Sequence, residues 1–318
     1  MASRASDPGA VLAIGGAEDK LKDRVILGRF IQLAGGEGAR IAVVSTASSL
    51  GDEATELYRA LFRQAGAGEV AGMRPTTRAE ANDPSLARMV RAASGVFLTG
   101  GNQLRLSSVV AGTLLGRELL AAHRRGAVIA GTSAGSSALS THMVAFGASG
   151  ATPKHRMVQV ASGLGIVTNV IIDQHFEQRN RLGRLLSAIA QSPNLLGVGL
   201  DEDTAALFEG DELEALGKGA VTIVDGSDIV TDAFFTKGHR PMMVSGAVIH
   251  SLPGGWRYDL VERRLVSRDV GTVSPDAQRW AGQRVRRQVR ELAAEGADDR
   301  APIRAARRRA QVKEEASE

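Results

Sequence analysis

The sequence contains no cysteine, which excludes disulfide bonds, zinc–thiolate sites and cysteine nucleophiles. Aromatic residues make up only 4% of it, so Val, Ile, Leu and Ala must build most of the core. It has no apolar run of about 18 residues, and this predicts that no helix crosses a membrane. The apolar run at 11–14 is too short for the core of a signal peptide. We therefore expect a cytoplasmic protein without a membrane partner.

Net positive charge is also scarce outside one short segment. The 318 residues carry a formal charge of +4, and ten Lys or Arg against seven Asp or Glu in 281–318 supply +3 of it. Residues 1–280 therefore carry only about +1. A surface that binds nucleic acid needs a marked excess of basic side chains. We therefore expect no nucleic-acid partner.

What the sequence does have is a regular alternation of short apolar runs and longer helical patterns. The apolar runs mostly lack polar alternation, as strands buried on both faces do. They lie at 11–14, 41–44, 95–98, 127–130, 167–172 and 195–200. The helical patterns lie at 21–34, 53–64, 84–93, 104–125 and 177–191. This alternation predicts an α/β fold, with a doubly wound, mostly parallel sheet flanked by helices.

After residue 211 the pattern changes to short strands separated by turns, at 220–224 and 241–250. We predict a β-rich C-terminal extension that completes the same domain. The predicted organisation is a single α/β domain over 1–280, followed by a charged helical or disordered tail over 281–318.

Polar and small residues gather directly after the predicted strands, where open α/β sheets bind ligands. One such segment, Gly131-Thr132-Ser133-Ala134-Gly135, matches the G-x-S-x-G pattern between a buried strand and a helix predicted over 136–143. This is the context of a nucleophile elbow, a tight turn in which small residues must flank the serine. Ser133 is therefore the predicted nucleophile, and the N–H of Ala134 is placed to stabilise an oxyanion.

A nucleophilic serine needs a base, and His175 is the histidine that ends a buried strand. The other five histidines lie in polar segments, in the helix predicted after the elbow, or at a late strand without a neighbouring acid. No Asp or Glu occurs between Ala134 and Ile172, so the acid that orients the base must come from elsewhere. Glu202 follows another predicted strand and is the preferred acid, with Asp173 as its competitor.

Three further segments invite a functional interpretation. Arg181 and Arg184 are three residues apart and share a helical face, which is either a solvated basic surface or a carboxylate clamp. The glycine pair at 100–101 forms either a plain turn or part of an oxyanion hole, with Gln103 placed to hold substrate. The segment Gly15-Gly16-Ala17-Glu18-Asp19-Lys20 lacks the ending of a P-loop and the G-x-G-x-x-G spacing, so we expect no bound nucleotide.

Taken in order, these segments resemble the cyanophycinases of peptidase family S51 over residues 14–205. The matching pieces are Ile14-Gly15-Gly16-Ala17-Glu18-Asp19-Lys20, Thr99-Gly100-Gly101-Asn102-Gln103, Gly131-Thr132-Ser133-Ala134-Gly135, Asp173-Gln174-His175-Phe176 with Arg179, Arg181 and Arg184, and Gly199-Leu200-Asp201-Glu202-Asp203-Thr204-Ala205. The related α-aspartyl dipeptidases are similar near the serine but take their acid from a short distance after it. The acid-free stretch after Ser133 therefore favours the cyanophycinase arrangement.

The resemblance implies a class I glutamine-amidotransferase-like fold and a homodimer that works without a metal or other cofactor. The implied activity is that of a serine exopeptidase. It would hydrolyse cyanophycin, a poly-aspartate with arginine joined to each side-chain carboxylate (multi-L-arginyl-poly-L-aspartate), to β-Asp-Arg dipeptides. The implied triad is Ser133, His175 and Glu202, with Gly101 and Ala134 in the oxyanion hole. The implied substrate-binding residues are Gln103, Asp173, Gln174, Arg179, Arg181 and Arg184.

A substrate with carboxylate and guanidinium groups needs both signs of charge in its site. Arg181 and Arg184 can take a carboxylate, and Asp173 can take a guanidinium. Two other functions stay open at this point. A dipeptidase acting on short aspartyl or isoaspartyl peptides would share the triad and differ in pocket depth. A non-catalytic binding protein of the same fold would be expected to lack some triad members, whereas this chain keeps all three.

Overall fold

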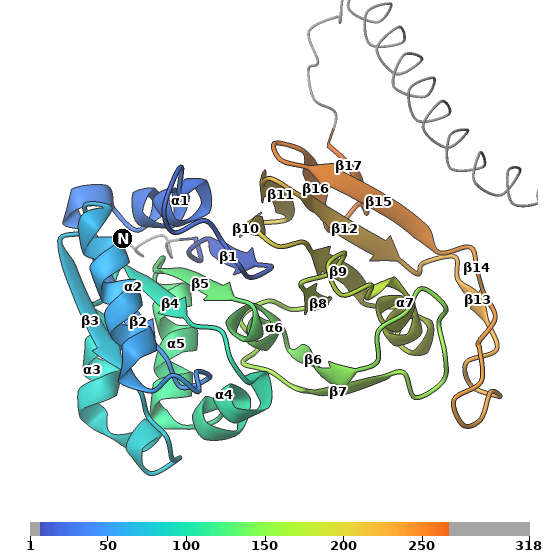
Figure 1. The fold of residues 1–318 in the computed structure, drawn as a ribbon, viewed down its shortest axis with the longest axis horizontal. Helices are drawn as coiled ribbons and strands as arrows, with labels where there is room; N and C mark the ends of the chain where they lie inside the picture. Colours follow the sequence, from blue (N-terminus) through green and yellow to red (C-terminus); the bar gives the residue numbers. More distant parts are fainter. Residues whose placement is uncertain (1–6, 267–318) are drawn as a thin grey trace, which may run out of the picture. The chain divides into compact units, whose positions relative to one another are not determined.

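The computed structural model describes residues 7–266 (Figure 1). The predicted tail at 281–318 and the predicted domain boundary at 280 lie outside these residues. The described chain is an α/β structure with two main sheets, one of nine strands and one of four. The predicted α/β fold with a β-rich C-terminal part is therefore confirmed.

The larger sheet has the strand order β17-β16-β11-β10-β1-β5-β4-β2-β3. The five strands from β1 to β3 pair in parallel, and the other four continue antiparallel beyond β1. The parallel strands are β1 (Val11–Ile14), β2 (Arg40–Val44), β3 (Glu69–Met73), β4 (Gly95–Leu98) and β5 (Val128–Thr132). The antiparallel strands are β10 (Thr204–Glu209), β11 (Glu212–Gly217), β16 (Arg257–Asp259) and β17 (Arg264–Leu265).

Helices cover both faces of the larger sheet, because apolar strand residues alternate between two core clusters. One face packs against α1 (Val25–Leu33) and α2 (Asp52–Gln64). The other packs against α3 (Pro84–Ala92), α4 (Gln103–Val110), α5 (Leu114–Arg124) and α6 (Ala134–Leu139). Two short 3₁₀ turns, η1 (Gly36–Gly38) and η2 (Glu80–Asn82), complete this part of the chain.

The few aromatic residues are concentrated on the α1–α2 face. Phe30, Phe62, Phe97 and Tyr58 contact one another with ring centroids 4.6–5.9 Å apart. Burying one such side chain contributes about 1.5–3 kcal/mol. Four of the chain's twelve aromatic residues thus form one cluster between the parallel strands and these two helices.

The smaller sheet has the order β15-β12-β9-β8, and only β8 and β9 pair in parallel. Its strands are β8 (Val170–Gln174), β9 (Leu196–Leu200), β12 (Ala220–Asp225) and β15 (Val248–Pro253). The helix α7 (Leu182–Gln191) packs on it through Leu185, Ala188 and Ile189. Two hairpins lie outside both sheets, β6 (His142–Gly147) with β7 (Val158–Ser162), and β13 (Val230–Thr231) with β14 (Val244–Ser245) (Figure 1).

All six strands predicted before residue 201 are present, with ends shifted by up to three residues. The prediction that places them in one sheet was wrong, because β8 and β9 belong to the smaller sheet. The strands β3, β6, β7, β10, β11, β13, β16 and β17 were not predicted. The strand predicted at 241–250 is wrong in extent, because Gly246 has a φ of 72° and separates β14 from β15.

Several predicted helices are wrong in extent. The pattern at 104–125 forms two helices separated at Gly112, whose φ is 72°. The helix predicted over 136–143 ends at Leu139, and β6 begins at His142, so His142 lies on a strand. The helix predicted at 177–191 begins at Leu182, because the chain first forms a turn. The helix predicted at 21–34 begins at Val25, because the Asp19 carboxylate accepts the N–H groups of the preceding turn.

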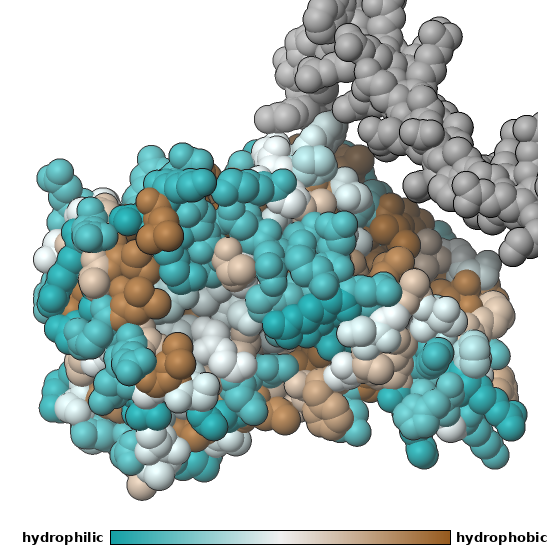
Figure 2. All heavy atoms as spheres, in the orientation of Figure 1, coloured by the Kyte–Doolittle hydropathy of each residue, from teal (hydrophilic) through white to brown (hydrophobic). Residues whose placement is uncertain are grey.

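The outer surface is polar over much of the face drawn in Figure 2, with separate hydrophobic patches. Among the described residues, Phe234 and Phe235 are 93% and 79% exposed and contact each other edge to face. No helix in the described part is long and apolar enough to span a lipid bilayer.

Candidate active site

Ser133 occupies the sharp turn between β5 and α6. Its backbone φ is 51° and its ψ is −112°, a conformation that a residue with a side chain rarely adopts. The flanking glycines make the turn possible. A Cβ atom at Gly131 would lie 2.5 Å from the carbonyl carbon of Gly135, and one at Gly135 would lie 2.3 Å from the Leu98 oxygen. Backbone strain of this kind is found at functional sites, where the surrounding structure holds a side chain in a required orientation.

The three predicted triad residues form one continuous hydrogen-bonded chain. Ser133 Oγ lies 2.8 Å from His175 Nε2. His175 Nδ1 lies 2.6 Å from Glu202 Oε1. Ser133 follows β5 of the larger sheet, whereas His175 and Glu202 follow β8 and β9 of the smaller one. The site therefore forms where strand ends from the two sheets meet, and Asp173 is not the residue that contacts the base.

The pKa of His175 is lowered from its ordinary value of 6.5, mainly because the ring is buried. The hydrogen bond that Nδ1–H donates to Glu202 opposes this by raising the pKa, and the charges of Arg179 and Arg181 lower it further. The balance favours neutral imidazole near pH 7. With Glu202 accepting the Nδ1 proton, Nε2 carries a lone pair that faces the Ser133 hydroxyl.

Gly100, more than Gly101, lies against the nucleophile. A Cβ atom at Gly100 would be 3.3 Å from Cβ of Ser133. Gly101 has a φ of 139°, and a Cβ there would lie 2.0 Å from the Ala47 oxygen, so its backbone packs on another loop. Ala134 is the first residue of α6, where backbone N–H groups lack a partner within the helix. The oxyanion role predicted for Gly101 and Ala134 stays a prediction.

Asp173, Arg181 and Arg184 pair with one another inside the protein. Asp173 is fully buried, and Arg184 binds both its oxygens, with Nε donating to Oδ2 at 2.6 Å. Arg181 Nη1 lies 3.3 Å from Asp173 Oδ1. Burial lowers the pKa of Arg181 to about 10. The contacts of Asp173 with a substrate guanidinium and of both arginines with a substrate carboxylate stay predictions, and in the structure these charges are paired with one another.

Gln103 and Gln174 are also engaged by the protein. Gln103 Nε2 donates to the Val144 and Ala145 carbonyl oxygens of β6, at 3.2 and 2.6 Å. Gln174 Oε1 accepts from Arg181 Nη1 at 3.0 Å. Arg179 differs from the other predicted substrate-binding residues, because its side chain is exposed and, within residues 7–266, makes no ion pair.

Two features of the site were missed from the sequence. Gln178 Oε1 accepts the backbone N–H of Glu202 at 2.9 Å and so holds the acid. Glu18 is only 3% exposed, and its Oε2 accepts from the Thr132 hydroxyl, directly before Ser133, at 2.6 Å. Gln178 belongs to the segment noted for its arginines, and Glu18 to the segment rejected as a nucleotide loop. No local pattern marks either contact, since each spans more than 20 residues.

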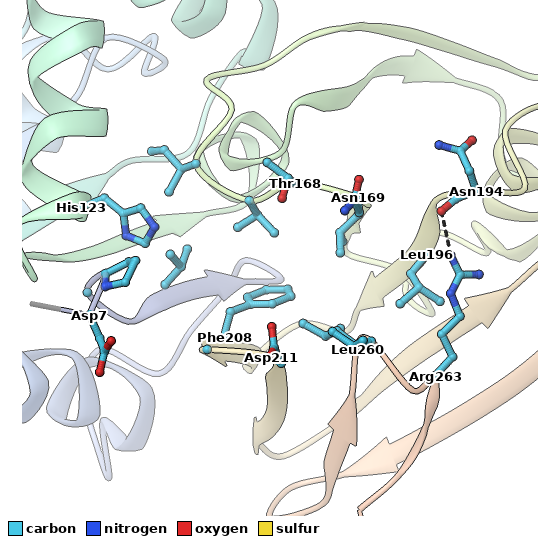
Figure 3. Close-up of a pocket in the computed structure, with 18 residues that line it drawn as sticks. Asp7, His123, Thr168, Asn169, Asn194, Leu196, Phe208, Asp211, Leu260 and Arg263 are labelled. Carbon is cyan, nitrogen blue, oxygen red and sulfur yellow. Dashed lines mark hydrogen bonds between the residues drawn. The ribbon is translucent and has the colours of Figure 1, made fainter. Parts of the chain in front are cut away.

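One pocket in the described part of the chain lies away from this site. It measures about 640 Å³ and is lined by Val11, Val170 and Leu196, the first residues of β1, β8 and β9 (Figure 3). The triad follows the last residues of strands, at the opposite edge. His123 lines the pocket, and burial lowers its pKa below the ordinary value. A smaller pocket of about 440 Å³ lies beside the segments that follow His175 and precede Glu202.

Comparison with known proteins identifies the family of this active site. Residues 11–216 match the model of peptidase family S51. The chain belongs to peptidase family S51. Cyanophycinases of Trichormus variabilis and Nostoc are each 42% identical to it over 261 residues, covering 81% of this chain and 87% of theirs. That of Synechococcus elongatus is 42% identical over 255 residues, covering 79% of each chain.

The fold of this S51 chain also occurs among solved structures. A peptidase from an acI-B1 actinobacterium matches with a TM-score of 0.56 and 24% identity, covering 78% of this chain and 99% of that one. At this identity the match supports the α/β fold alone. The resemblance to family S51 inferred from the ordered motifs is thus confirmed.

Proposed function

We propose that this chain is a cyanophycinase, a serine exopeptidase that releases β-Asp-Arg dipeptides from multi-L-arginyl-poly-L-aspartate. One observation carries the proposal. The hydrogen-bonded chain Ser133–His175–Glu202 occurs in an S51 sequence that is 42% identical to curated cyanophycinases over four fifths of its length. A binding protein would have no need of a strained serine aimed at a neutral imidazole.

The chemistry follows the geometry of these three side chains. As Ser133 Oγ attacks the substrate carbonyl, Nε2 of His175 takes its proton, and Glu202 stabilises the resulting imidazolium. The N–H of Ala134, with N–H groups of the glycine pair at 100–101, stabilises the oxyanion. His175 then gives the proton to the leaving amine. Water, activated by the same base, hydrolyses the acyl-enzyme and frees Ser133.

Substrate charge is met by the exposed groups beside the triad. Arg179 lies near enough to His175 to lower its pKa, and its free guanidinium is suited to a substrate carboxylate. Glu177 is exposed and lines the 440 Å³ pocket, where its carboxylate is suited to a substrate guanidinium. Asp201 lines the same pocket, but its oxygens accept the backbone N–H groups of Glu177 and Ala220. Asp173, Arg181 and Arg184 then support the site from behind.

The substrate assignment is tested with purified protein on insoluble cyanophycin, in buffer with EDTA and no added metal. We expect soluble β-Asp-Arg, identified by mass spectrometry. A set of short α-aspartyl and isoaspartyl dipeptides serves as the comparison substrate. Faster turnover of the dipeptides, with cyanophycin left intact, would reassign the chain as a dipeptidase. No turnover of either would favour a binding protein of this fold.

The proposal includes a homodimer located in the cytoplasm. Neither is required by the triad, which one chain supplies completely. Sedimentation of the purified protein tests the first, with a mass of twice 33.4 kDa expected and a monomer mass contradicting it. Fractionation of the producing cells tests the second.

A further inference from the structure

Three successive carbonyl groups at the end of β1 each hold one arm of the triad. The Ile14 oxygen accepts the backbone N–H of Ser133 at 2.9 Å, and the Gly15 oxygen accepts that of His175 at 2.9 Å. The Gly16 oxygen accepts the N–H of Asp203, the residue after Glu202, at 2.9 Å. Three segments that are far apart in the sequence are thus fixed to consecutive residues of one loop.

The glycines of this loop are required by close contact with the triad. A Cβ atom at Gly16 would lie 2.4 Å from Cε1 and 2.6 Å from Nε2 of His175, so the imidazole rests directly on this backbone. One at Gly15 would lie 2.0 Å from the Asp201 oxygen. Only glycine at these two positions lets the loop backbone pack this closely against His175 and against the turn that carries Glu202. The glycine pair is therefore explained without a bound phosphate.

Glu18 anchors the same loop to the strand that carries the nucleophile. Its Oε2 accepts from the Thr132 hydroxyl at 2.6 Å, and its Oε1 accepts from the Tyr58 hydroxyl at 2.5 Å. Lys20 Nζ lies 2.9 Å from Oε1 and offsets the charge. Burial and the nearby carboxylate raise the pKa of Tyr58, so its hydroxyl remains a donor. Both carboxylate oxygens are thus occupied within the protein.

Asp19 fastens the far end of the loop. Its backbone N–H donates to Asp203 Oδ1 at 2.8 Å, which ties the loop a second time to the turn that carries Glu202. Its own carboxylate accepts N–H groups from the turn at 21–24. The loop is therefore held at the nucleophile by Glu18 and at the acid by Asp19, with the base resting on Gly16 between them.

We propose that the 15–19 loop is the element that aligns the three arms of the triad, and that Glu18 is a positioning residue for Ser133. This inference rests on the proposed serine-peptidase function. Glu18 touches neither substrate nor the reacting atoms, and acts through the hydroxyl of Thr132. Its loss should therefore lower the reactivity of Ser133 while leaving substrate binding nearly unchanged.

The test measures Ser133 reactivity directly, with diisopropyl fluorophosphate as a probe that needs no knowledge of the natural substrate. Glu18→Gln keeps the size of the side chain and removes the charge. We expect its labelling rate constant and its kcat on cyanophycin to fall about 10- to 100-fold, the range that a misplacement of about 1 Å can produce. KM should stay within about twofold, as positioning without lost binding requires.

Thr132 offers a second, smaller change on the other side of the same hydrogen bond. Thr132→Val should lower the labelling rate in the same direction as Glu18→Gln, and Thr132→Ser, which keeps the hydroxyl, should restore it. The double variant should lose no more than the larger single loss, because both changes break one interaction. If Glu18→Gln does not fold, the Val and Ser pair decides the question.

Glu118→Gln is the matched control. Glu118 is 6% exposed and forms ion pairs with Arg91 and Arg125 at 2.6 and 2.8 Å. Its replacement therefore also removes a buried carboxylate and the ion pairs it makes. It should lower thermal stability and leave the labelling rate of the folded protein unchanged. Equal labelling of wild type, Glu18→Gln and Thr132→Val would overturn the inference and leave the proposed function intact. Failure of the wild type to label or to hydrolyse would overturn both.

Discussion

Two buried acidic side chains support the candidate site, one beside the strand of the larger sheet that leads to Ser133 and one on the strand of the smaller sheet that leads to His175. Their partners differ. Glu18, behind the strand of Ser133, accepts two hydroxyl groups and pairs with one lysine. Asp173, on the strand that leads to His175, is held by two arginines. The first cluster has no net charge, whereas the second carries one excess positive charge.

The difference suits what each cluster stands behind. The nucleophile must be placed accurately. Neutral hydroxyl donors can fix its strand in place without adding a net electrostatic charge beside it. The base must be neutral to accept a proton, and a positive charge behind it disfavours the imidazolium. Arg181 lowers the pKa of His175, although by less than burial and the charge of Arg179 do. One cluster therefore sets position, and the other sets position together with protonation. The following variants, from the largest expected effect to the smallest, separate these roles.

Asp173→Asn should produce the largest loss, and it should be a loss of folding. It leaves two buried arginines facing each other without a compensating charge, and breaking a buried pair in this way costs about 3–5 kcal/mol. Urea denaturation measures the free energy of unfolding. Glu56→Gln, which breaks an exposed pair with Arg59, is the control and should cost about 0–1 kcal/mol. Equal costs would mean that the Asp173 cluster is not a buried support.

Gly16→Ala should lower activity strongly with a smaller effect on stability. The new methyl group would overlap the His175 ring, and the φ of 100° adds backbone strain. We expect kcat to fall about 100-fold, as for a misplaced base. Gly28→Ala is the control, because Gly28 lies in α1 with open space around it; helix propensity should stabilise this variant by about 1 kcal/mol without changing kcat. An active Gly16→Ala variant would show that the base does not depend on this contact.

The pH profile of kcat/KM tests the electrostatic side of the comparison. Protonated His175 cannot accept the serine proton, so the acid limb should lie below 6.5, where burial places the pKa. Glu202→Gln removes the effect that raises this pKa, so the remaining acid limb should move to lower pH. Arg179→Gln removes a repulsion, so the limb should move to higher pH. Shifts of the same sign in both variants would contradict the assigned causes.

Gln178→Ala should give the smallest effect. It removes one hydrogen bond to the backbone N–H of Glu202, a group at the exposed edge of the site, and such a bond contributes about 0.5–1.5 kcal/mol. We expect kcat to fall no more than about tenfold with the pH profile nearly unchanged. A loss as large as that of Glu202→Gln would make Gln178 a principal part of the triad's support.

The meeting of Ser133, His175 and Glu202 was predictable because the signals for these residues are local. A serine between small residues after a buried run, a histidine at a strand end and a long acid-free stretch each follow from neighbouring residues. The same locality predicted β1, β2, β4 and β5 of the parallel core, where apolar runs are buried on both faces, but not β3, which is only partly buried. Ser133, His175 and Glu202 then meet because strand ends converge, although the sheets that carry them differ.

The features that were not predicted depend mainly on contacts between residues that are distant in the sequence. The spacing of Arg181 and Arg184 is the same whether these arginines face solvent or pair with an acid. Only the fold brings Asp173 to both of them. The Gly15–Lys20 segment lacks nucleotide motifs and is similar to the S51 pattern, but neither observation predicts that the Gly15 and Gly16 oxygens accept backbone N–H groups more than 100 residues away. The elbow helix was overestimated because a turn after Leu139 begins a hairpin that no periodicity marks.

The most direct test of the account is the rate at which Ser133→Ala releases β-Asp-Arg from cyanophycin, compared with the wild type in EDTA-containing buffer. Removing a triad nucleophile typically costs about 10⁴-fold or more. The account predicts a loss of at least that size, in a variant that melts at the wild-type temperature because only a hydroxyl is removed. Product release at the wild-type rate by a folded Ser133→Ala protein would contradict it.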